Sequence, residues 1–484
     1  DAFFDFRVSD IAMGSGHFLV GAVDRIESRL YAYLTENPLS PVEDELDNLE
    51  DAALDAFEDE EYAPPVERGQ LLRRQVARRC IYGVDINPLS TELARLSIWV
   101  HTFVPGLPLT FLDYNLVTGD SLAGIGTLDE VTDILDQEQT TLGSFVGGQS
   151  VMNEIRGDLS ELADFADASA EQVQEARETR ASIESRLDEV RSRFDVLAAS
   201  RIDNEIDTDP VSDTKIDIRE EPCYEQAQEV LASTDPLHFP ASFPEVFDGE
   251  QSGFDVIVGN PPWEKAKSER HEFWARHYPG LRGLSQAERE HRIDELSSER
   301  PDLVEEFERE TLAQDKLSAI LTAGPYPGIG AGDPDMYIAF GWRFWHLVAS
   351  GGRMGVVLPR SALSTAGSEP LRRRLLEQGQ FVDLTFLKNK REWAFSNMEP
   401  RFTIALCGIE ASEPGPDTTV PIRGPYPDPE SFEAGVNRDP YRFPVNEAAS
   451  WTGAASFPLF PSDPRSVGVF NQFTSAPKLG MDDP

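Results

Sequence analysis

The stretch FDVIVGNPPWEKAK, residues 254–267, decides the fold. Residues 254–258 are mostly apolar, which predicts a strand buried in a parallel sheet. After a glycine come Asn260, two prolines that cannot continue a strand ladder, and Trp263. Open α/β sheets bind their ligands at the carboxyl ends of their strands. The sequence therefore predicts a ligand site at residues 260–263.

The length and cysteine content limit the class of protein. A chain of 484 residues is long enough for several domains and a large core. It starts at Asp1 rather than at a methionine, and we expect it to be a fragment of a longer protein. Its three cysteines lie far apart, and no apolar run approaches the ~20 residues that a membrane span needs. We therefore expect a cytoplasmic protein that contacts no membrane.

The composition is strongly acidic, with 86 Asp and Glu against 43 Lys and Arg and a net charge of −43. Only seven of the basic residues are lysines. Such a surface resembles that of halophilic proteins, which remain soluble in concentrated salt. High net charge also favours disorder, but 40% hydrophobic and 10% aromatic residues support packed cores. At first sight the charge argues against nucleic acid as a partner.

Predicted strands and helices alternate over much of the chain. This alternation predicts an α/β fold with a doubly wound parallel sheet. We predict strands at residues 7–11, 80–86, within 109–120, and at 254–258, 352–359, 381–387 and 401–409, and helices at 18–34, 68–79, 87–103 and 336–349.

Two long segments interrupt the alternation. Both are rich in helix formers, and apolar residues three and four apart in the first predict a helical hairpin inserted into the sheet. A free coiled coil for a partner is the alternative. After residue 410 proline becomes frequent, which predicts the start of a further module, cut short. The predicted regions are residues 1–126 (with an acidic insertion at about 38–65), 127–240 (helical insertion), 241–410 (with a helical insertion at about 264–323) and 411–484 (C-terminal module).

A glycine turn, DIAMGSGHFL, follows the first predicted strand. Gly14 and Gly16 bracket a tight turn, and a helix begins at His17 or Phe18. Glycines let the backbone approach a ligand closely, and the start of a helix offers unpaired N–H groups. The pattern indicates a nucleotide-like cofactor, either a dinucleotide or S-adenosylmethionine. An ordinary turn is the alternative, because glycine turns after strands are common.

Two aspartates end the next two predicted strands. Asp85, in YGVDINPLS, stands where an acidic side chain accepts hydrogen bonds from both ribose hydroxyls. It lies 69 residues after Gly16 instead of about 20, so the acidic insertion must loop out of the sheet. Capping of the next helix is the alternative role. Asp120, in TGDSL, is placed to accept a hydrogen bond from the adenine amino group of a cofactor, although this is also a common turn.

The NPPW segment, residues 260–263, carries the most specific chemistry. An asparagine oxygen and the carbonyl of the following proline can each accept one hydrogen of an exocyclic amino group. The prolines hold that loop rigid, and Trp263 can stack on a planar base, worth ~1–3 kcal/mol. Nothing in the segment is a general base or a nucleophile. The pattern favours direct transfer to a neutral amine, in which positioning is the main contribution.

Together these motifs resemble those of the S-adenosylmethionine-dependent DNA adenine methyltransferases of the gamma class. The sequence is especially similar to the large methylases of type IIG restriction–modification and of BREX-type phage defence. DIAMGSGHFL resembles motif I, GVDINPLS motif II, GDSL motif III, NPPW the catalytic motif IV, and MEPRFTIAL motif VIII; LHFPASFPEVF, GDPDMYIAF and GGRMGVVLP are also characteristic. The similarity spans roughly residues 1 to 410.

The resemblance implies a doubly wound, Rossmann-like methyltransferase sheet with large helical insertions. It implies S-adenosyl-L-methionine as cofactor and double-stranded DNA as partner, with other restriction or defence subunits as further partners. It assigns residues 1–126 to cofactor binding, 241–410 to catalysis and 411–484 to target recognition. The implied catalytic residues are Asn260, Pro261, Pro262 and Trp263, the cofactor-binding residues are Asp10, Ala12, Gly14, Ser15, Gly16, Asp85, Ile86, Asp120 and Ser121, and the residues stacking on the flipped base are Trp263 and Phe402.

Two departures from the family pattern stand out. Ile11 occupies the position after the motif I acid, where the family usually has proline. Motif X, which helps hold the methionine end of the cofactor, would lie before Asp1. We therefore expect this chain to bind cofactor poorly without the upstream motif.

A basic segment offers a surface for DNA. Residues 353–401 contain nine Lys and Arg against five acids, in a chain that is otherwise acidic. A solvated helix face is the alternative reading for the arginines at 372–374. We predict phosphate contacts at Arg372, Arg373, Arg374, Lys388, Lys390 and Arg391.

Three other functions remain open at this point. In the first alternative, the protein transfers the methyl group to another amine or amide, because similar loops occur in protein-glutamine and guanine-amino methyltransferases. A defence-complex subunit that recognises DNA without turnover is the second. An NAD-dependent oxidoreductase would explain the glycine turn and Asp85 but leave residues 260–263 without a role. The histidines at 271, 277 and 291 lack a metal-ligand spacing, and we expect no metal.

Overall fold

A nine-stranded sheet runs through the described part of the chain, in the order β3-β2-β1-β4-β5-β7-β6-β8-β9. The computed structural model describes residues 3–57, 65–108, 112–137, 170–213, 215–232, 234–247, 252–266, 270–330, 334–396, 402–459, 468–470 and 472. The strands are β1 (Val8–Asp10), β2 (Ile81–Asp85), β3 (Leu116–Thr118), β4 (Phe254–Gly259), β5 (Val348–Pro359), β6 (Gln380–Lys388), β7 (Thr403–Glu410), β8 (Thr419–Tyr426) and β9 (Tyr441–Pro444).

The strands β3, β2, β1, β4 and β5 are all parallel, and they form the doubly wound half of the sheet. The strand order reverses between β1 and β4, which are hydrogen-bonded neighbours although far apart in sequence. In doubly wound sheets this switch point opens a crevice at the carboxyl ends of the strands. Asp10 ends β1 and Gly259 ends β4, so both of the main predicted motifs begin at this crevice.

The other half of the sheet is mixed. Strand β7 is antiparallel to both β5 and β6, and β8 then pairs in parallel with β6. Strand β9 closes this edge antiparallel to β8. The boundary that we predicted at residue 410 therefore falls between two strands of one sheet. The assignment of residues 411–484 to target recognition stays a prediction.

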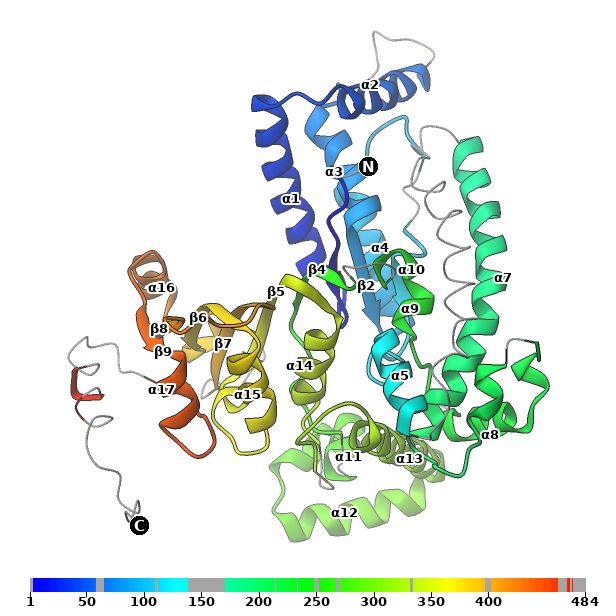
Figure 1. Cartoon of the computed structure of the whole chain (residues 1–484). Helices are drawn as coiled ribbons and strands as arrows, with labels where there is room; N and C mark the ends of the chain where they lie inside the picture. Colours follow the sequence, from blue (N-terminus) through cyan, green and yellow to red (C-terminus); the bar gives the residue numbers. More distant parts are fainter. Residues whose placement is uncertain are drawn as a thin grey trace.

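Helices cover the sheet and form two further groups beside it (Figure 1). Helices α1, α3 and α4 pack on β1 to β3, and α14 and α15 pack on β4 to β6. Helices α7 and α8 pack on one another, as do α11, α12 and α13 in succession. The described helices are α1 (His17–Glu36), α2 (Ser40–Asp55), α3 (Arg68–Cys80), α4 (Pro88–His101), α5 (Leu128–Gln137), α7 (Ala170–Ser200), α8 (Pro222–Leu231), α9 (Phe239–Ser242), α10 (Pro244–Phe247), α11 (Arg270–His277), α12 (Gln286–Glu299), α13 (Pro301–Ala323), α14 (Met336–Leu347), α15 (Glu369–Glu377), α16 (Pro429–Val436) and α17 (Val445–Ser450). None of the described helices is long and apolar enough to cross a membrane.

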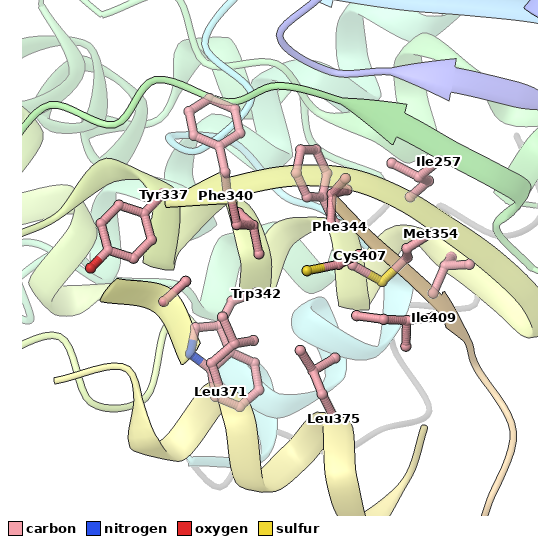
Figure 2. Packing of buried hydrophobic residues seen from close by; sticks show 14 of the residues in the cluster. Ile257, Tyr337, Phe340, Trp342, Phe344, Met354, Leu371, Leu375, Cys407 and Ile409 are labelled. Atoms are coloured by element: carbon pink, nitrogen blue, oxygen red, sulfur yellow. The ribbon is translucent and has the colours of Figure 1, made fainter. Parts of the chain in front are cut away.

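The central core lies between the sheet and helices α14 and α15. Side chains of β4 alternate between the two faces: Ile257 packs in this core, whereas Val256 and Val258 pack on the side of α1. Burial of each large apolar side chain stabilises the folded state by about 1.5–3 kcal/mol relative to leaving it exposed. Figure 2 shows the core residues Ile257, Met354, Cys407 and Ile409 of the strands against Tyr337, Phe340, Trp342 and Phe344 of α14 and Leu371 and Leu375 of α15.

The two helical groups have apolar cores of their own. Helices α5, α7 and α8 share one cluster, which includes Leu135, Leu187 and Ala227. Helices α11 to α13 share another around Trp274 and Leu296. Both lie where the sequence predicts helical insertions, although the division of the chain into domains stays a prediction. Part of the predicted hairpin, at residues 138–169, lies outside the described residues.

The predicted fold class is confirmed: the protein is α/β with a large sheet and many helices. Each predicted strand and helix corresponds to an observed element, although β5 begins at Val348, inside the segment predicted as a helix. No helix or strand was predicted within the acidic insertion, and helix α2 forms there. Its acids face arginines of α3, where Arg68 pairs with Glu43 and Arg79 pairs with Glu45.

The arginines of α15 have internal roles that correct part of the phosphate prediction. Arg372 is 1% exposed, and its guanidinium donates to the carbonyl oxygens of Ala362, Thr365, Ala454 and Ala455. Burial lowers the pKa of Arg372 to about 10. A buried guanidinium already bonded to backbone oxygens is not placed to contact a phosphate, so the prediction is wrong for Arg372 in this structure.

The neighbouring arginines are half-buried. Arg373 donates to Glu369 on its own helix and to the carbonyls of Ala449 and Gly453. Arg374 donates to Gln378 and lies over the ring of Trp342, with 5.8 Å between the guanidinium carbon and the ring centroid. The phosphate prediction for these two stays untested. Arg372 and Arg373 together attach residues 449–455 to α15.

We predict that Arg372→Met destabilises the protein by at least about 3 kcal/mol, because several buried carbonyl oxygens lose their donor at once. Hydrogen exchange of residues 449–459 should accelerate more than that of β7. Chemical denaturation and exchange mass spectrometry measure the two effects. Arg374→Met is the matched control, since its guanidinium donates to an exposed side chain. Equal effects of the two substitutions would contradict the anchoring role of Arg372.

Candidate functional site

Asp10 and Gly259 meet at the switch point of the sheet. Asp10 is fully buried, and its Oδ1 accepts a hydrogen bond from the N–H of Ala12 at 3.0 Å. A Cβ placed on Gly259 would lie 3.0 Å from the same Oδ1, so a glycine here keeps the approach between the two strands open. The other carboxylate oxygen of Asp10, Oδ2, is buried without a hydrogen-bond partner. It is an acceptor at the start of the crevice.

The glycine turn has the backbone that its sequence predicts. Gly14 and Gly16 have φ of 54° and 81°, a left-handed conformation that L side chains rarely adopt. A Cβ on Gly16 would lie 3.2 Å from Ala94 of α4, while one on Gly14 would meet nothing within 4 Å. The turn therefore packs closely on α4 at Gly16 and is open at Gly14. Ser15 Oγ lies 2.9 Å from His17 Nδ1 at the start of α1.

Asp85 contacts the glycine turn, and the cap of α4 is Asn87, whose side chain accepts from the N–H of Leu89. Its Oδ2 accepts from the N–H of Gly14 at 2.9 Å, and its Oδ1 accepts from the N–H of Asn87 at 2.9 Å. Each carboxylate oxygen keeps a further lone pair for a ligand hydroxyl. Ile86, the next residue, is 65% exposed. The contact between Asp85 and Gly14 confirms that the acidic insertion loops out, because motifs 71 residues apart in sequence touch.

Asp120 and Ser121 are buried beside the same turn. Ser121 Oγ donates to the carbonyl of Ile11 at 2.7 Å. Asp120 Oδ1 accepts from the N–H groups of Leu122 and Ala123, as in a common turn. Burial raises the pKa of Asp120, against the effect of these two N–H groups and of Arg343. The structure thus places Asp10, Asp85 and Asp120 at the carboxyl ends of neighbouring strands β1, β2 and β3.

Residues 260–263 follow β4 with two polar atoms that lack partners. Asn260 Oδ1 and Trp263 Nε1 are both buried without a hydrogen bond. Pro261 is buried and Pro262 is exposed. Burying an unpaired amide oxygen or indole N–H costs about 1–3 kcal/mol. Such a cost is understandable where a ligand supplies the missing partners.

The chain after Trp263 is tied to the start of α14. The N–H of Ala266 donates to Pro334 O at 2.9 Å, and the N–H of Met336 donates to Glu264 O at 3.0 Å. Lys265 and Asp335 form an isolated antiparallel bridge between the same segments. The GDPDM stretch therefore helps to fix the NPPW loop. Gly332 and Asp333 of that stretch lie outside the described residues.

The loop after β6 approaches the same place and contains a residue that the sequence analysis missed. Asn389 is fully buried, and its side chain bonds both N–H and C=O of Phe395 and the N–H of Ala394. Trp263 and Trp393 pack against one small cluster formed by Val357, Leu387 and Ile404. Asn389 thereby shapes the loop beside Trp263. Its only sequence signal was an amide directly after an apolar strand.

Phe402 and the remaining basic residues lie around this loop. Phe402, just before β7, is 47% exposed, and its carbonyl accepts from the N–H of Asn389 at 3.4 Å. Lys390 and Arg391 are exposed, and Lys388 at the end of β6 is half-buried. Arg391 has φ of 58°, so the backbone turns sharply at the exposed tip. The structure thus places Phe402, Trp263 and three predicted phosphate-contacting residues near the ends of β4, β6 and β7.

The residues of the crevice fit a cationic, adenosine-containing cofactor. The open side of Gly14 leaves space over the turn, and Asp85 has lone pairs free for ribose hydroxyls. The unpaired Oδ2 of Asp10 is an acceptor that suits a positively charged group. This chemistry matches S-adenosylmethionine, which has an ammonium group and a sulfonium. The roles of Asp10, Ala12, Gly14, Ser15, Gly16, Asp85, Ile86, Asp120 and Ser121 in binding it stay predictions.

The fold and the crevice define an α/β protein with a ligand site at the switch point of a doubly wound sheet. Within it, residues 79–294 match the family described as Eco57I restriction-modification methylase. This span includes Asp85, Asp120 and residues 260–263. A comparison with curated proteins finds no match.

Several solved structures resemble the chain weakly. A modification subunit ascribed to a type I restriction enzyme from Vibrio vulnificus YJ016 has a TM-score of 0.38 at 12% identity, covering 94% of this chain and 54% of that one. A nuclease-deletion mutant of the type ISP restriction-modification enzyme LlaGI, with a DNA substrate mimic, has 0.37 at 10%, covering 96% and 24%. The DrdV–DNA complex has 0.35 at 12%, covering 90% and 26%. The chain thus spans about half or less of these proteins.

We predict that Asp10→Asn stabilises the ligand-free protein at pH 8 but not at pH 4. Burial, with a smaller contribution from Asp85, raises the pKa of Asp10 from 3.8 to about 7. Between these values the folded state holds the extra proton, so wild-type stability falls as pH rises towards 7. The full shift corresponds to at most about 4 kcal/mol. Denaturation of both proteins at the two pH values measures the difference.

The control for this prediction is Asp51→Asn, an exposed carboxylate on α2. It measures the effect of replacing an aspartate by asparagine at the surface. A stability difference that does not change with pH for Asp10→Asn would contradict the buried, ionisable state assigned to Asp10.

Proposed function

We propose that this protein is a DNA methyltransferase that transfers a methyl group from S-adenosylmethionine to the exocyclic amino group of a flipped adenine. The proposed setting is restriction–modification or phage defence. The observation that carries the proposal is the buried Asn260 Oδ1, an acceptor without a donor at the carboxyl end of β4. The family match over residues 79–294 supports a methylase. The motif order and the crevice residues support the cofactor.

Asn260 and the loop after it would hold the target amine. In the proposed complex, Asn260 Oδ1 accepts one N–H of the amino group and the carbonyl of Pro261 accepts the other. Because both hydrogens of the amine are held by acceptors, the lone pair of its nitrogen points towards the crevice and gains electron density. The diproline and the attachment of residues 264–266 to the start of α14 keep the acceptors in place. This positioning replaces a general base.

Aromatic residues would hold the base outside the duplex. Extrusion of a base costs a few kcal/mol. Trp263 and Phe402 lie on opposite loops, after β4 and before β7, and stacking on such rings returns about 1–3 kcal/mol per base. Trp263 Nε1 has an unused donor for the base or its backbone. S-Adenosylmethionine, when bound, would supply an electrophilic methyl group and leave as S-adenosylhomocysteine, and the methylated nitrogen would release one proton to solvent.

We predict that Asn260→Ala lowers the methyl-transfer rate at least about 100-fold, the scale of losing one preorganised hydrogen bond to a reacting group. Cofactor affinity should stay within about 3-fold of wild type, because Asn260 is not assigned to the cofactor. The assay follows labelled S-adenosylmethionine into unmodified duplex DNA in high salt, with digestion to identify the modified base. Isothermal titration measures cofactor affinity.

The matched control for this assay is Asn48→Ala, which changes an exposed amide on α2. Label on cytosine or guanine would overturn the assignment of adenine as the target base, while the proposal of a DNA methyltransferase would stand. Cofactor binding without transfer to any DNA would favour a recognition subunit without turnover, or another amine acceptor.

We predict that the double substitution Lys390→Ala and Arg391→Ala weakens DNA binding about equally for all sequences. These exposed cations lie on the loop that carries Trp393, next to the proposed base pocket. The slope of log affinity against log salt should fall by roughly 2, since each phosphate contact contributes about 0.9. Fluorescence anisotropy over a salt series measures it.

The control pair, Arg282→Ala with Arg309→Ala, changes the net charge by the same amount on the distant helical group. Both arginines are exposed. An equal fall in slope for the control would show that only net charge matters, and would remove the local phosphate role of Lys390 and Arg391.

A further inference from the structure

The loop after β3, residues 121–127, forms its hydrogen bonds with side chains instead of a strand ladder. It connects Asp120, at the proposed adenine end of the crevice, to helix α5. The N–H groups of Leu122 and Ala123 donate to Asp120, that of Ile125 donates to His238 Nδ1, and that of Gly126 donates to Glu130 Oε2. The loop therefore depends on distant residues for its shape.

The carbonyl groups of the loop also bond outside a strand ladder, to two side chains and to one backbone N–H. Leu122 O accepts from Tyr326 Oη at 2.8 Å, and Gly124 O accepts from Arg343 Nη2 at 2.9 Å. Ile125 O accepts from the N–H of Phe239 at 2.9 Å. The backbone N–H and C=O groups are thus all hydrogen-bonded at Leu122 and at Ile125. Little conformational freedom therefore remains in the backbone beside Asp120.

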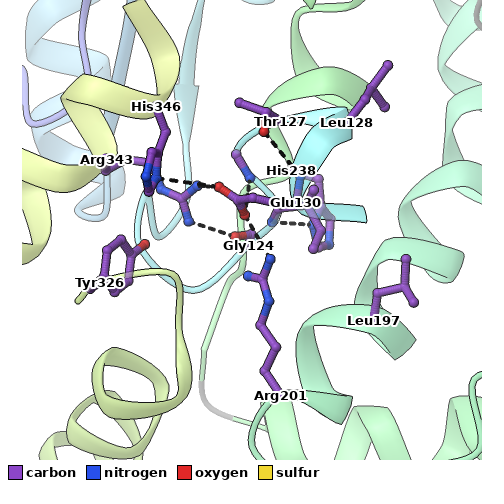
Figure 3. Close-up of polar contacts among 12 residues, drawn as sticks. Gly124, Thr127, Leu128, Glu130, Leu197, Arg201, His238, Tyr326, Arg343 and His346 are labelled. Carbon is purple, nitrogen blue, oxygen red and sulfur yellow. Dashed lines mark hydrogen bonds and ion pairs between the residues drawn. The ribbon is translucent and has the colours of Figure 1, made fainter. Parts of the chain in front are cut away.

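Glu130 and Arg343 form the centre of this network (Figure 3). Arg343 is fully buried and Glu130 is 7% exposed, and their side chains are bonded at 2.6 Å. Arg201, just after α7, donates to the other oxygen of Glu130 at 2.8 Å. Burial alone would raise the pKa of Glu130, but Arg343 and Arg201 outweigh burial and lower the pKa to about 2. Glu130 is therefore ionised at any working pH.

The glycines of the loop allow this close approach. A Cβ on Gly126 would lie 1.7 Å from Arg343 Nη1, and one on Gly124 would lie 2.0 Å from Leu237 O. No side chain fits at either position without moving the network. The loop sequence and the buried ion pair therefore require one another.

The network joins three parts of the molecule. Glu130 lies on α5, Arg201 follows α7, and Arg343 lies on α14, the helix that packs behind β4. A second link runs in parallel: His238 Nε2 lies 3.0 Å from Asp195 Oδ1 on α7 while His238 Nδ1 accepts from Ile125. Both links run from the helical insertion to the loop that begins at Asp120.

We propose that the Glu130–Arg343 pair is the positioning device for the adenine end of the cofactor pocket and couples that pocket to the helical insertion. The proposal rests on the proposed function, because it takes S-adenosylmethionine as the ligand. Neither residue touches the ligand. They act by fixing the backbone of residues 122–126, which holds the carboxylate of Asp120 towards the adenine amino group. Burial raises the pKa of Asp120, and the charge of Arg343 opposes that rise, which favours the accepting form of Asp120.

The test replaces the pair as a unit. In Glu130→Leu with Arg343→Met, both charges of the pair leave together, so that neither member stays buried without the other. Arg201, whose side chain is 11% exposed, loses its bond to Glu130 in the same variant. Glu295→Leu with Arg292→Met is the matched control, an exposed pair on α12 whose atoms lie 2.7 Å apart. Hydrogen exchange of β7 in each variant verifies that the sheet is intact.

Two readouts separate positioning from general stability. Exchange at residues 122–126 should accelerate about 10-fold or more in the Glu130/Arg343 variant, because bonds worth about 1–2 kcal/mol are lost there. Wild-type protein should prefer S-adenosylhomocysteine to S-inosylhomocysteine, which lacks the amino group, and the variant should lose about 10-fold of that preference. The control pair should change neither quantity.

Different results would contradict the positioning role and the proposed function. Unchanged exchange at residues 122–126 in a folded variant overturns the positioning role. Equal loss of affinity for both compounds also overturns it, because the pair would then act only on stability. Full-length wild-type protein that binds neither compound refutes the proposed function first, and the pocket role of the pair falls with it. Retention of the preference in the single variant Arg343→Lys, with Glu130 kept, would support the role of the charge.

Discussion

The pairing of β1 with β4 is the constraint on which the rest of the structure depends. The N–H of Arg7 bonds to the carboxylate of Asp255 at 2.8 Å, across a sequence separation of 248 residues. The chain between these residues adds β2 and β3 to one side of β1 and then returns to place β4 on the other side. The acidic insertion and the first helical insertion therefore loop out from the sheet. The crevice exists because these two short strands are neighbours and their carboxyl ends point the same way.

Internal arginines are a second theme of the fold. Arg343 and Arg372 are buried, and Arg193 is 5% exposed, and each donates to several backbone carbonyls where the chain turns. A guanidinium has five N–H donors in a fixed plane, whereas an ammonium has three on a flexible stem. The excess of arginine over lysine therefore has a use inside the protein as well as on an acidic surface. In each case one cation joins segments that are far apart in sequence.

The strands and motifs could be predicted from the sequence because the residues that identify each of them are close together in the chain. The apolar run before Asn260, the glycines at 14 and 16, and the aspartates at strand ends each lie within a few residues, and the sheet brings them together as expected. Asn389, Glu130 and Arg372 were not assigned their observed roles, since nothing nearby in sequence identifies their partners. Glu130 looks like one acid of an acidic helix until Arg201 and Arg343 are placed around it. Arg372 looked like a phosphate contact because three consecutive arginines resemble a basic face.

The separation of the cores has a consequence for how the chain is made. The cluster beneath α1, α3 and α4 is built almost wholly from residues 4–116, while the central core needs strands from both halves. A ribosome adding about 5–20 residues per second needs roughly 12–50 seconds to go from β1 to β4. During that time one face of the first three strands can be covered, but β1 has an open edge and an uncovered second face. The nascent protein therefore has an unpaired edge at β1, where the crevice will form, until β4 has been translated.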